Sequence, residues 1–185
     1  MCQASAYCSL RIRYMDDERY GMLAFRPVNQ YKEGLLASFL HQCYAMLLSD
    51  EPLFWQPEEE KWLQFDQDVF NNRKTIGQYV FITCLDEVEI GFASFNPRPR
   101  PDFGIIGHNC VLPSYQRDGI GKRQVMEMLE RFRKMGIKQA RVVTSDHPFF
   151  LPARKMYLGC GFHEKKRWIK GPDPRYDLVE YEINL

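Results

Sequence analysis

Apolar and polar residues repeat along this chain in patterns that predict short strands interspersed with helices. Residues 8–14 alternate between apolar and basic side chains. Residues 22–25 form a second apolar run that stops before Pro27, so an N-terminal hairpin is expected. The same patterns predict six further strands, at residues 79–85, 89–95, 105–112, 140–144, 162–170 and 178–185. Residues 96–102 carry three prolines, which cannot donate to a sheet ladder, so an irregular loop or a sheet edge is expected there.

Helical periodicity separates these strands. One helix is expected over residues 30–49, where apolar positions recur at helical spacing: Leu36, Phe39, Leu40, Cys43 and Leu47. A second helix is expected to begin at Pro57, with the acidic residues 58–60 in its first turn. A third follows a glycine-bearing loop after residue 112 and ends at Gly136, and a short fourth covers residues 148–157. This mixed order predicts one α/β or α+β domain.

Composition narrows the class of protein. The 185 residues fit one domain, 1–185, with residues 1–20 as an N-terminal extension, and a hydrophobic content of 45% can fill a core. The formal net charge of +1 gives no electrostatic reason to expect nucleic acid or an anionic membrane as partner. No apolar run is long enough to span a bilayer. The six cysteines form no CxxC pair, so we expect free thiols, no metal and a cytoplasmic protein.

One segment carries recognisable chemistry. Residues 111–122 read Val-Leu-Pro-Ser-Tyr-Gln-Arg-Asp-Gly-Ile-Gly-Lys, in which a strand ends, glycines allow close approach to the backbone, and a helix begins. Unpaired N–H groups at a helix start attract anions, so a pyrophosphate is a natural ligand, with Arg117, Lys122 and Arg123 nearby. The segment matches neither a Walker A loop nor the GxGxxG fingerprint, and an ordinary tight turn is the alternative.

The surroundings of this loop resemble the GNAT superfamily of acyl-CoA-dependent N-acyltransferases. Residues 116–121 are similar to the family's (Arg/Gln)-x-x-Gly-x-(Gly/Ala) loop, with a similar lead-in before it. Downstream, Ala153-x-x-x-Tyr157-x-x-x-Gly161-Phe162 is similar to the second family signature. Residues 25–27 resemble the family's opening strand, so the likeness covers residues 22–185.

The resemblance implies a single GNAT-like domain of α/β (α+β) class. It would have a mixed, twisted sheet of six to seven strands flanked by about four helices, and one extra N-terminal strand is an open option. The sheet would splay at its middle to admit acetyl-CoA as cosubstrate. The residues expected to bind it are Cys110, Val111, Leu112, Gln116, Arg117, Asp118, Gly119, Ile120, Gly121 and Lys122. One departure is Phe150, which stands where the family often has Asn. That polar contact is then absent or supplied by Ser145, Asp146 or His147.

Acyl transfer from a thioester to an amine needs a proton donor for the departing thiolate. By its place in the second signature, Tyr157 matches the family's frequent general acid. A phenol remains protonated at neutral pH and can donate to sulfur. The alternative for Tyr157 is packing where the helix meets the sheet.

The reaction also needs a base, because a lysine-like amine has a pKa of about 10.4 and must lose a proton. His108, a water chain ordered by Asn109, and Asp102 are the open options. Strand alternation places His108 on the same face as Cys110, away from the active face that holds Ile105 and Asn109, unless a bulge shifts the register.

The remaining candidates have simpler explanations. Cys110 could act as a nucleophile only in a ping-pong scheme, and packing is expected. His147 and His163 are expected on the surface. An aromatic cluster forms either a wall of the acceptor site or core packing under two helices: Phe54, Trp55, Trp62 and Phe65.

The sequence therefore predicts an N-acetyltransferase that transfers the acetyl group of acetyl-CoA to a primary amine of a small molecule or peptide, by direct attack in a ternary complex. The alternative is a catalytically silent module of the same fold that binds or senses acyl-CoA. A nucleotide-binding fold that uses the Gly119 loop is a third and weaker option. An exposed C-terminal strand makes a homodimer reasonable, and the identity of the acceptor is not encoded in any recognisable motif.

Overall fold

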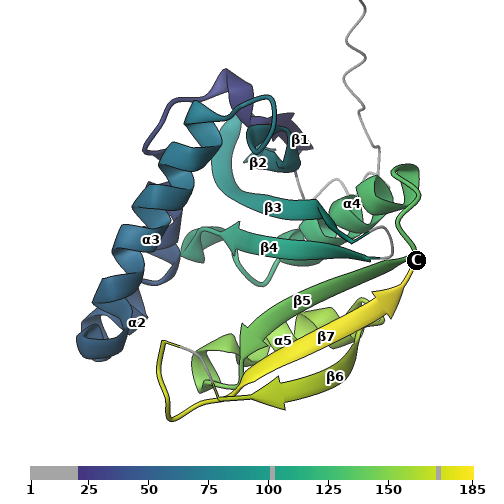
Figure 1. Cartoon of the computed structure of the whole chain (residues 1–185). Helices are drawn as coiled ribbons and strands as arrows, with labels where there is room; N and C mark the ends of the chain where they lie inside the picture. Colours follow the sequence, from purple (N-terminus) through teal and green to yellow (C-terminus); the bar gives the residue numbers. More distant parts are fainter. Residues whose placement is uncertain (1–20, 101–102, 170–171) are drawn as a thin grey trace, which may run out of the picture.

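The computed structural model describes residues 21–100, 103–169 and 172–185 (Figure 1). The strand predicted at residues 8–14, Cys2 and Cys8, and the base candidate Asp102 lie outside these ranges. The strands are β1 (Leu23–Pro27), β2 (Val80–Leu85), β3 (Val88–Arg100), β4 (Phe103–Val111), β5 (Gln139–Ser145), β6 (His163–Trp168) and β7 (Leu178–Asn184). The α-helices are α1 (Leu35–Cys43), α2 (Ala45–Asp50), α3 (Pro52–Asn71), α4 (Ile120–Lys134) and α5 (Leu151–Gly159). Short 3-10 turns are η1 (Val28–Gln30), η2 (Gly77–Tyr79), η3 (Pro113–Tyr115) and η4 (Pro148–Phe150).

The seven strands form one mixed sheet in the order β1-β2-β3-β4-β5-β7-β6, which confirms the predicted fold class. Strands β4 and β5 are parallel, and every other neighbouring pair is antiparallel. The C-terminal strand β7 lies between β5 and β6, so the expectation that it has an exposed edge is wrong. Within the described residues, no helix has the length and hydrophobicity needed to cross a membrane.

Helices cover both faces of the sheet. On one face, Val125 and Phe132 of α4 cluster with Phe81 of β2, and α5 packs beside α4. On the other face, Leu40 of α1 belongs to a separate apolar cluster with Phe92 of β3, and α3 packs on α1. Figure 1 shows the long helix α3 standing beyond the ends of β3 and β4. The two clusters put a continuous apolar core on each side of the central strands.

The sheet splays between β4 and β5. These strands pair from Phe103↔Gln139 to Ile106↔Val142 and no further. β4 then continues to Val111 and β5 to Ser145, and Figure 1 shows the two diverging from their common start. Beyond residue 106, one edge of β4 therefore has no neighbouring strand.

The helical region before β2 differs from the prediction. The helix expected over residues 30–49 is kinked at Tyr44 (φ −104°), where α1 gives way to α2 while the hydrogen bonds of Tyr44 continue on both sides. The next helix begins at Pro52 rather than Pro57, which lies inside α3. The acidic residues 58–60 consequently lie beyond the first turn. Burial of Trp55 among other rings offsets the hydrogen bond that Pro57 cannot donate.

The proline-rich segment also differs. We expected residues 96–102 to be an irregular loop or edge, yet β3 continues to Arg100. Asn96 pairs with Ile105 and Arg100 with Phe103, and the register shifts between these two pairs. The prolines interrupt the ladder there without ending the strand, since a residue lacking N–H is tolerated where pairing is irregular.

Candidate functional site

The loop before α4 presents a row of unpaired backbone N–H groups. Arg117 (φ +74°) and Gly119 (φ +73°) both adopt the left-handed conformation, which turns the chain sharply into the helix. In the described part of the chain, no acceptor is in hydrogen-bonding range of the amides of residues 117–122. Gln116, Arg117, Asp118, Gly119 and Lys122 are exposed, so the row is open to solvent. Free amides at a helix N-terminus are a geometry that can bind an anion, and the prediction that residues 116–122 do so remains a prediction.

Two glutamines hold this loop and helix against the end of β4. Gln116 donates from Nε2 to the carbonyl of Val111 at 2.9 Å. The buried Gln124 of α4 donates to Thr83 Oγ1 at 2.7 Å and to the carbonyl of Cys110 at 3.3 Å. These bonds fix the unpaired amides of the loop relative to the free edge of β4.

The free edge of β4 presents particular peptide groups. Leu112 donates to the carbonyl of Ile90 at 2.8 Å, so alternation directs the peptide groups of Asn109 and Val111 away from β3, toward the opening. Of the three strand-end residues predicted to contact a cofactor arm, Val111 directs its peptide group toward this opening, whereas Cys110 and Leu112 direct theirs toward β3. The carbonyl of Val111 already accepts from Gln116 Nε2 and from Cys43 Sγ at 3.2 Å.

A cavity of about 370 Å³ opens between β4 and β5 and extends to Tyr44, between α1 and α2, and to Trp55 of α3. Tyr157 lines it and is 5% exposed, and burial raises the pKa of its phenol, which therefore stays protonated. Asn109 lines the same cavity, and its Oδ1 is buried without a partner. The structure thus brings two of the sequence-predicted residues to one hollow, beside the free edge of β4.

A bulge in β4 changes the position of His108 relative to the residues that precede it in the strand. Ala93 pairs with Asn109 and Phe95 with Ile106, so one extra residue of β4 stands opposite Ser94. His108 consequently points to the face of α3, where its ring lies 4.7 Å from Phe65. His108 thus lies on the side of Cys110, as expected, whereas Ile106 belongs to the cluster on the α4 side. The one-residue insertion separates His108 from Ile106 and lets it line the cavity with Ile105, which a strict two-residue period does not predict.

His108 also lines the cavity, together with a smaller hollow of about 260 Å³ on the far side of Ile105 and Gly107. Burial lowers the pKa of its imidazole to about 4, so the ring is neutral at physiological pH. A neutral imidazole can accept a proton, but a pKa this low makes it a weak base.

Tyr44 is a cavity residue that was not identified from the sequence. Its ring stacks on Trp55 (centroids 5.9 Å apart) and on Trp62 (5.1 Å), and burial together with the nearby Tyr157 raises its pKa. Its position four residues after the buried Leu40 places it on the apolar face of α1, which is the signal that could have revealed it. In the aromatic cluster considered above, Trp62 packs in the core, whereas Trp55 lines the cavity.

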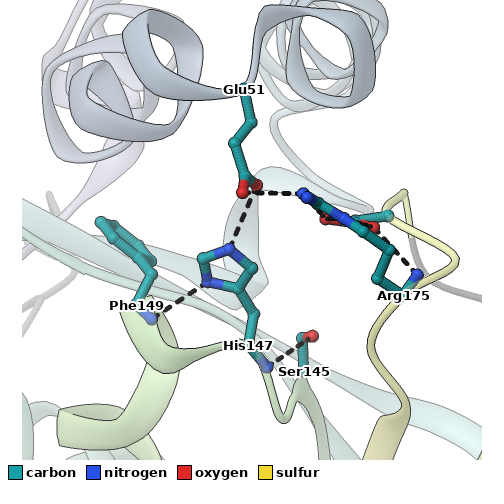
Figure 2. A network of polar contacts seen from close by, with 6 residues as sticks. Glu51, Ser145, His147, Phe149 and Arg175 are labelled. Carbon is teal, nitrogen blue, oxygen red and sulfur yellow. Dashed lines mark hydrogen bonds and ion pairs between the residues drawn. The ribbon is translucent and has the colours of Figure 1, made fainter.

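Beside the cavity, a polar network joins three distant segments (Figure 2). Glu51, between α2 and α3, accepts from His147 Nε2 at 3.1 Å and from Arg175 Nη2 at 2.7 Å. Phe149 donates its N–H to His147 Nδ1 at 3.0 Å, which leaves the ring proton on Nε2. Arg175 also binds Asp173 and lowers the pKa of that carboxyl.

His147 was expected on the surface and is instead 8% exposed, because it caps η4 and contacts Glu51 and Tyr176. The carboxylates and imidazole of Glu51, His147 and Asp173 have ligand atoms within 4.8 Å of one another, a grouping that could hold a cation. The two carboxylates, Glu51 and Asp173, contact the guanidinium of Arg175, which is the cation of this group.

The remaining candidates behave as follows. His163 is exposed, as predicted. Cys110 is buried, burial raises its pKa, and its Sγ faces the carbonyl of Phe39 at 3.5 Å, which fits packing rather than nucleophilic attack. Phe150 lines the cavity, and of the polar residues proposed to replace the missing Asn, Ser145 lines it as well.

Comparison with known proteins identifies the family. The model of the acetyltransferase (GNAT) family matches residues 40–162, which includes both glycine-bearing motifs and Tyr157. The chain belongs to the GNAT acetyltransferase family. The family match and the seven-stranded sheet together confirm the recognition and fold predicted from the sequence.

Solved structures share the fold of this GNAT chain at low sequence identity. A Desulfovibrio desulfuricans protein described as an acetyltransferase of the GNAT family has a TM-score of 0.69 at 16% identity, covering 88% of this chain and 97% of that one. A Salmonella typhimurium acetyltransferase solved with its cofactor acetyl-CoA has a TM-score of 0.61 at 16% identity, with coverage of 88% and 93%. The NatC complex bound to Gag peptide and CoA contains a chain with a TM-score of 0.62 at 17% identity, with coverage of 88% and 98%. A search of curated proteins found no match.

Proposed function

We propose that this GNAT chain is an N-acetyltransferase that uses acetyl-CoA to acetylate a primary amine bound in the cavity. The observation that carries the proposal is the convergence of the buried, protonated Tyr157 and the free edge of β4 on one cavity. The relatives solved with acetyl-CoA or with CoA and a peptide support the choice of cosubstrate and of an amine acceptor.

The anion site and the strand edge fit the two ends of acyl-CoA. The amides of residues 117–122, with Lys122 nearby, would hold the pyrophosphate. The peptide groups of Asn109 and Val111 would pair with the amide-rich arm in the place of a missing strand. Gly121 permits α4 to approach α5, because a Cβ there would lie 3.1 Å from Met156 Sδ.

Acetyl-CoA would supply an activated acetyl thioester, and side chains of the cavity would manage the protons. The amine nitrogen forms the new C–N bond while the C–S bond breaks, and Tyr157 gives its proton to the departing sulfur. The amine must lose a proton before or during attack. His108 or a water held by Asn109 would take it, and the phenol of Tyr157 regains a proton from solvent.

One observation favours the alternative, a module that binds acyl-CoA without turnover. None of the described residues that line the cavity is a carboxylate, and the neighbouring imidazole of His108 has a pKa of about 4. A strong general base is therefore missing from the cavity walls. The two functions differ in turnover and share the same cosubstrate site.

The test combines calorimetric titration with an assay of thiol release. Acetyl-CoA and CoA should bind to the purified chain while ATP does not, and an amine panel should then release CoA thiol. Tyr157→Phe should lower turnover about a hundredfold while leaving acetyl-CoA affinity unchanged. Tyr181→Phe is the matched control, since Tyr181 is buried in the same core cluster but does not line the cavity. Equal rates for Tyr157→Phe and the wild type would remove Tyr157 from the mechanism, and binding without turnover on any amine would favour the silent module.

A further inference from the structure

Three aromatic rings from separate segments form one wall of the cavity. Tyr44 follows α1, Trp55 belongs to α3, and Phe150 ends η4. Their centroids lie 5.9 Å apart for Tyr44 and Trp55, 6.0 Å for Tyr44 and Phe150, and 5.7 Å for Trp55 and Phe150. These three residues are called the aromatic box below. Because Tyr44 stacks on both Trp55 and Trp62, the wall offers a ligand apolar aromatic surface rather than an open face of Tyr44.

The cavity presents no formal charge to a ligand. None of the described residues that line it is Asp, Glu, Lys or Arg, and burial keeps His108 neutral. A substrate with two or more ammonium groups would leave the second one without a counter-ion, and burying an unpaired charge is costly.

Two carboxylates near cavity residues in the chain are already engaged in hydrogen bonds. Glu51 lies four residues before Trp55, and its two oxygens accept from Arg175 and His147 (Figure 2). Asp173, one residue after the cavity residue Pro172, is held by the same arginine. Each oxygen of these two carboxylates accepts a hydrogen bond from Arg175 or His147, and neither Glu51 nor Asp173 lines the cavity. The network therefore shapes the wall without presenting a free carboxylate to the acceptor.

The indole of Trp55 is a second distinctive feature of this wall. Its side chain is 5% exposed and lines the cavity, and its indole N–H has no acceptor among the described residues. Buried donors of this kind normally have a partner, so Trp55 is the ring of this wall whose polar atom is left unsatisfied by the described residues. Trp62 differs from Trp55 in its relation to the cavity. It also stacks on Tyr44 and is 6% exposed. Among the described residues, however, it does not line the cavity, and its indole nitrogen is not one of the buried atoms that lack a partner.

We propose that the acceptor is a primary amine with a single amino group and an aromatic ring, and that this ring packs against the aromatic box. This proposal rests on the function proposed above. The ring faces of the box stabilise the single ammonium until it loses its proton. A cavity of about 370 Å³ is shared by the acetyl end of the cosubstrate and one such ring. Polyamines and other multiply charged amines are excluded by the uncharged walls.

Three small amines test this proposal with the full chain and acetyl-CoA. 2-Phenylethylamine carries one charge and a ring, butylamine one charge without a ring, and 1,4-diaminobutane two charges without a ring. The specificity constant kcat/KM, measured by thiol release, should be at least about tenfold higher for 2-phenylethylamine than for either other amine. Calorimetric titration of each amine into the CoA-saturated protein provides a readout that does not depend on turnover, and the same order of affinity is expected.

Substituting Trp55 and Trp62 in turn tests which residue produces the preference for an aromatic amine. Trp55→Phe should reduce the ratio of kcat/KM for 2-phenylethylamine over butylamine about fivefold, with acetyl-CoA affinity unchanged. Trp62→Phe, at the other face of Tyr44, should leave the ratio as in the wild type. An equal ratio in both variants would remove Trp55 from acceptor selection.

The outcomes separate this inference from the function on which it rests. If acetyl-CoA binds and butylamine or the diamine is acetylated as well as 2-phenylethylamine, the acceptor class is wrong and the N-acetyltransferase stands. If acetyl-CoA does not bind, or no amine is acetylated, the proposed function fails and the acceptor class is overturned with it.

Discussion

The hydroxyl of Ser94 accepts a hydrogen bond from the backbone N–H of His108 at 2.8 Å, across the bulge of β4. A Cβ at the neighbouring Gly107 would lie 2.6 Å from the same hydroxyl, so the bulge, the glycine and the serine fit one another closely. This contact decides on which face of the sheet the imidazole of His108 lies, and therefore whether it reaches the cavity.

Replacing this serine should disturb the bulge. Ser94→Ala leaves the N–H of His108 without its acceptor, which should lower the free energy of unfolding by about 1–3 kcal/mol. Urea denaturation measures this directly, and Ser38→Ala, at an exposed position on α1, should change stability much less. An unchanged stability for Ser94→Ala would mean that the bulge does not depend on the hydroxyl.

His108 should make stability depend on pH. Its pKa is lowered from 6.5 to about 4 by burial, so the unfolded chain takes up a proton more readily than the folded one. The stabilisation is complete above pH 6.5 and falls as the pH drops toward 4. Its maximum corresponds to about 3 kcal/mol, of which about 2 kcal/mol should be lost between neutral pH and about pH 5.

The comparison that checks this is urea denaturation of His108→Gln at the two pH values. The variant should lose about 2 kcal/mol less than the wild type on acidification, whatever its absolute stability. His163→Gln, at an exposed position in β6, should follow the wild-type pH dependence. Parallel curves for the wild type and His108→Gln would show that the buried imidazole does not contribute.

The case of His108 shows how far sequence reasoning reaches here. The strand itself, the glycine loop and the Tyr157 signature were all predicted, because each depends on residues close together in sequence. The separation of His108 from Ile106 was not, because it depends on one extra residue opposite Ser94, which no two-residue period reveals. We did predict from the sequence that a bulge in this strand would change the register of His108.

Two glycines with the same backbone strain can separate binding from folding. Gly119 (φ +73°) and Gly136 (φ +75°) both have open space where a Cβ would go. Alanine at either position should therefore cost a similar amount of stability, about 1 kcal/mol. Gly119→Ala should additionally weaken acetyl-CoA binding, measured by calorimetry, because the new methyl group stands among the amides of residues 117–122. If both variants weaken binding equally, the loop is not the pyrophosphate site.

The Glu51 network should control the shape of the cavity. Glu51→Gln removes the charge that holds Arg175 and His147, which should lower the free energy of unfolding by about 2 kcal/mol. The KM for the acceptor should rise while acetyl-CoA affinity stays constant, because the network joins the walls around the acceptor rather than the loop at α4. Glu59→Gln, which breaks the ion pair with His41 on the exposed side of α3, is the matched control and should change neither value. A rise in KM for both variants would indicate a general loosening of the helix.

The same network explains why the helical region and His147 were mispredicted. Glu51 and His147 are 96 residues apart, and their contact has no signature in either local sequence. The kink at Tyr44 and the early start of α3 at Pro52 likewise follow from rings that meet only in the folded chain. Local periodicity identified the helices correctly, whereas their ends depended on tertiary packing.

The short ladder between β4 and β5 has a consequence for how long the folded protein persists. Strands β5, β7 and β6 connect to the remaining sheet through only the pairs from Phe103↔Gln139 to Ile106↔Val142. An acyl-CoA bound along the free edge would act as the strand that is missing, tying two halves of the sheet into one cooperative unit. A ligand at a hundredfold excess over its Kd adds about 2.7 kcal/mol to the free energy of unfolding. Amide hydrogens on both sides of the opening should then exchange with solvent more slowly, and the supply of acyl-CoA would set the lifetime of the native chain.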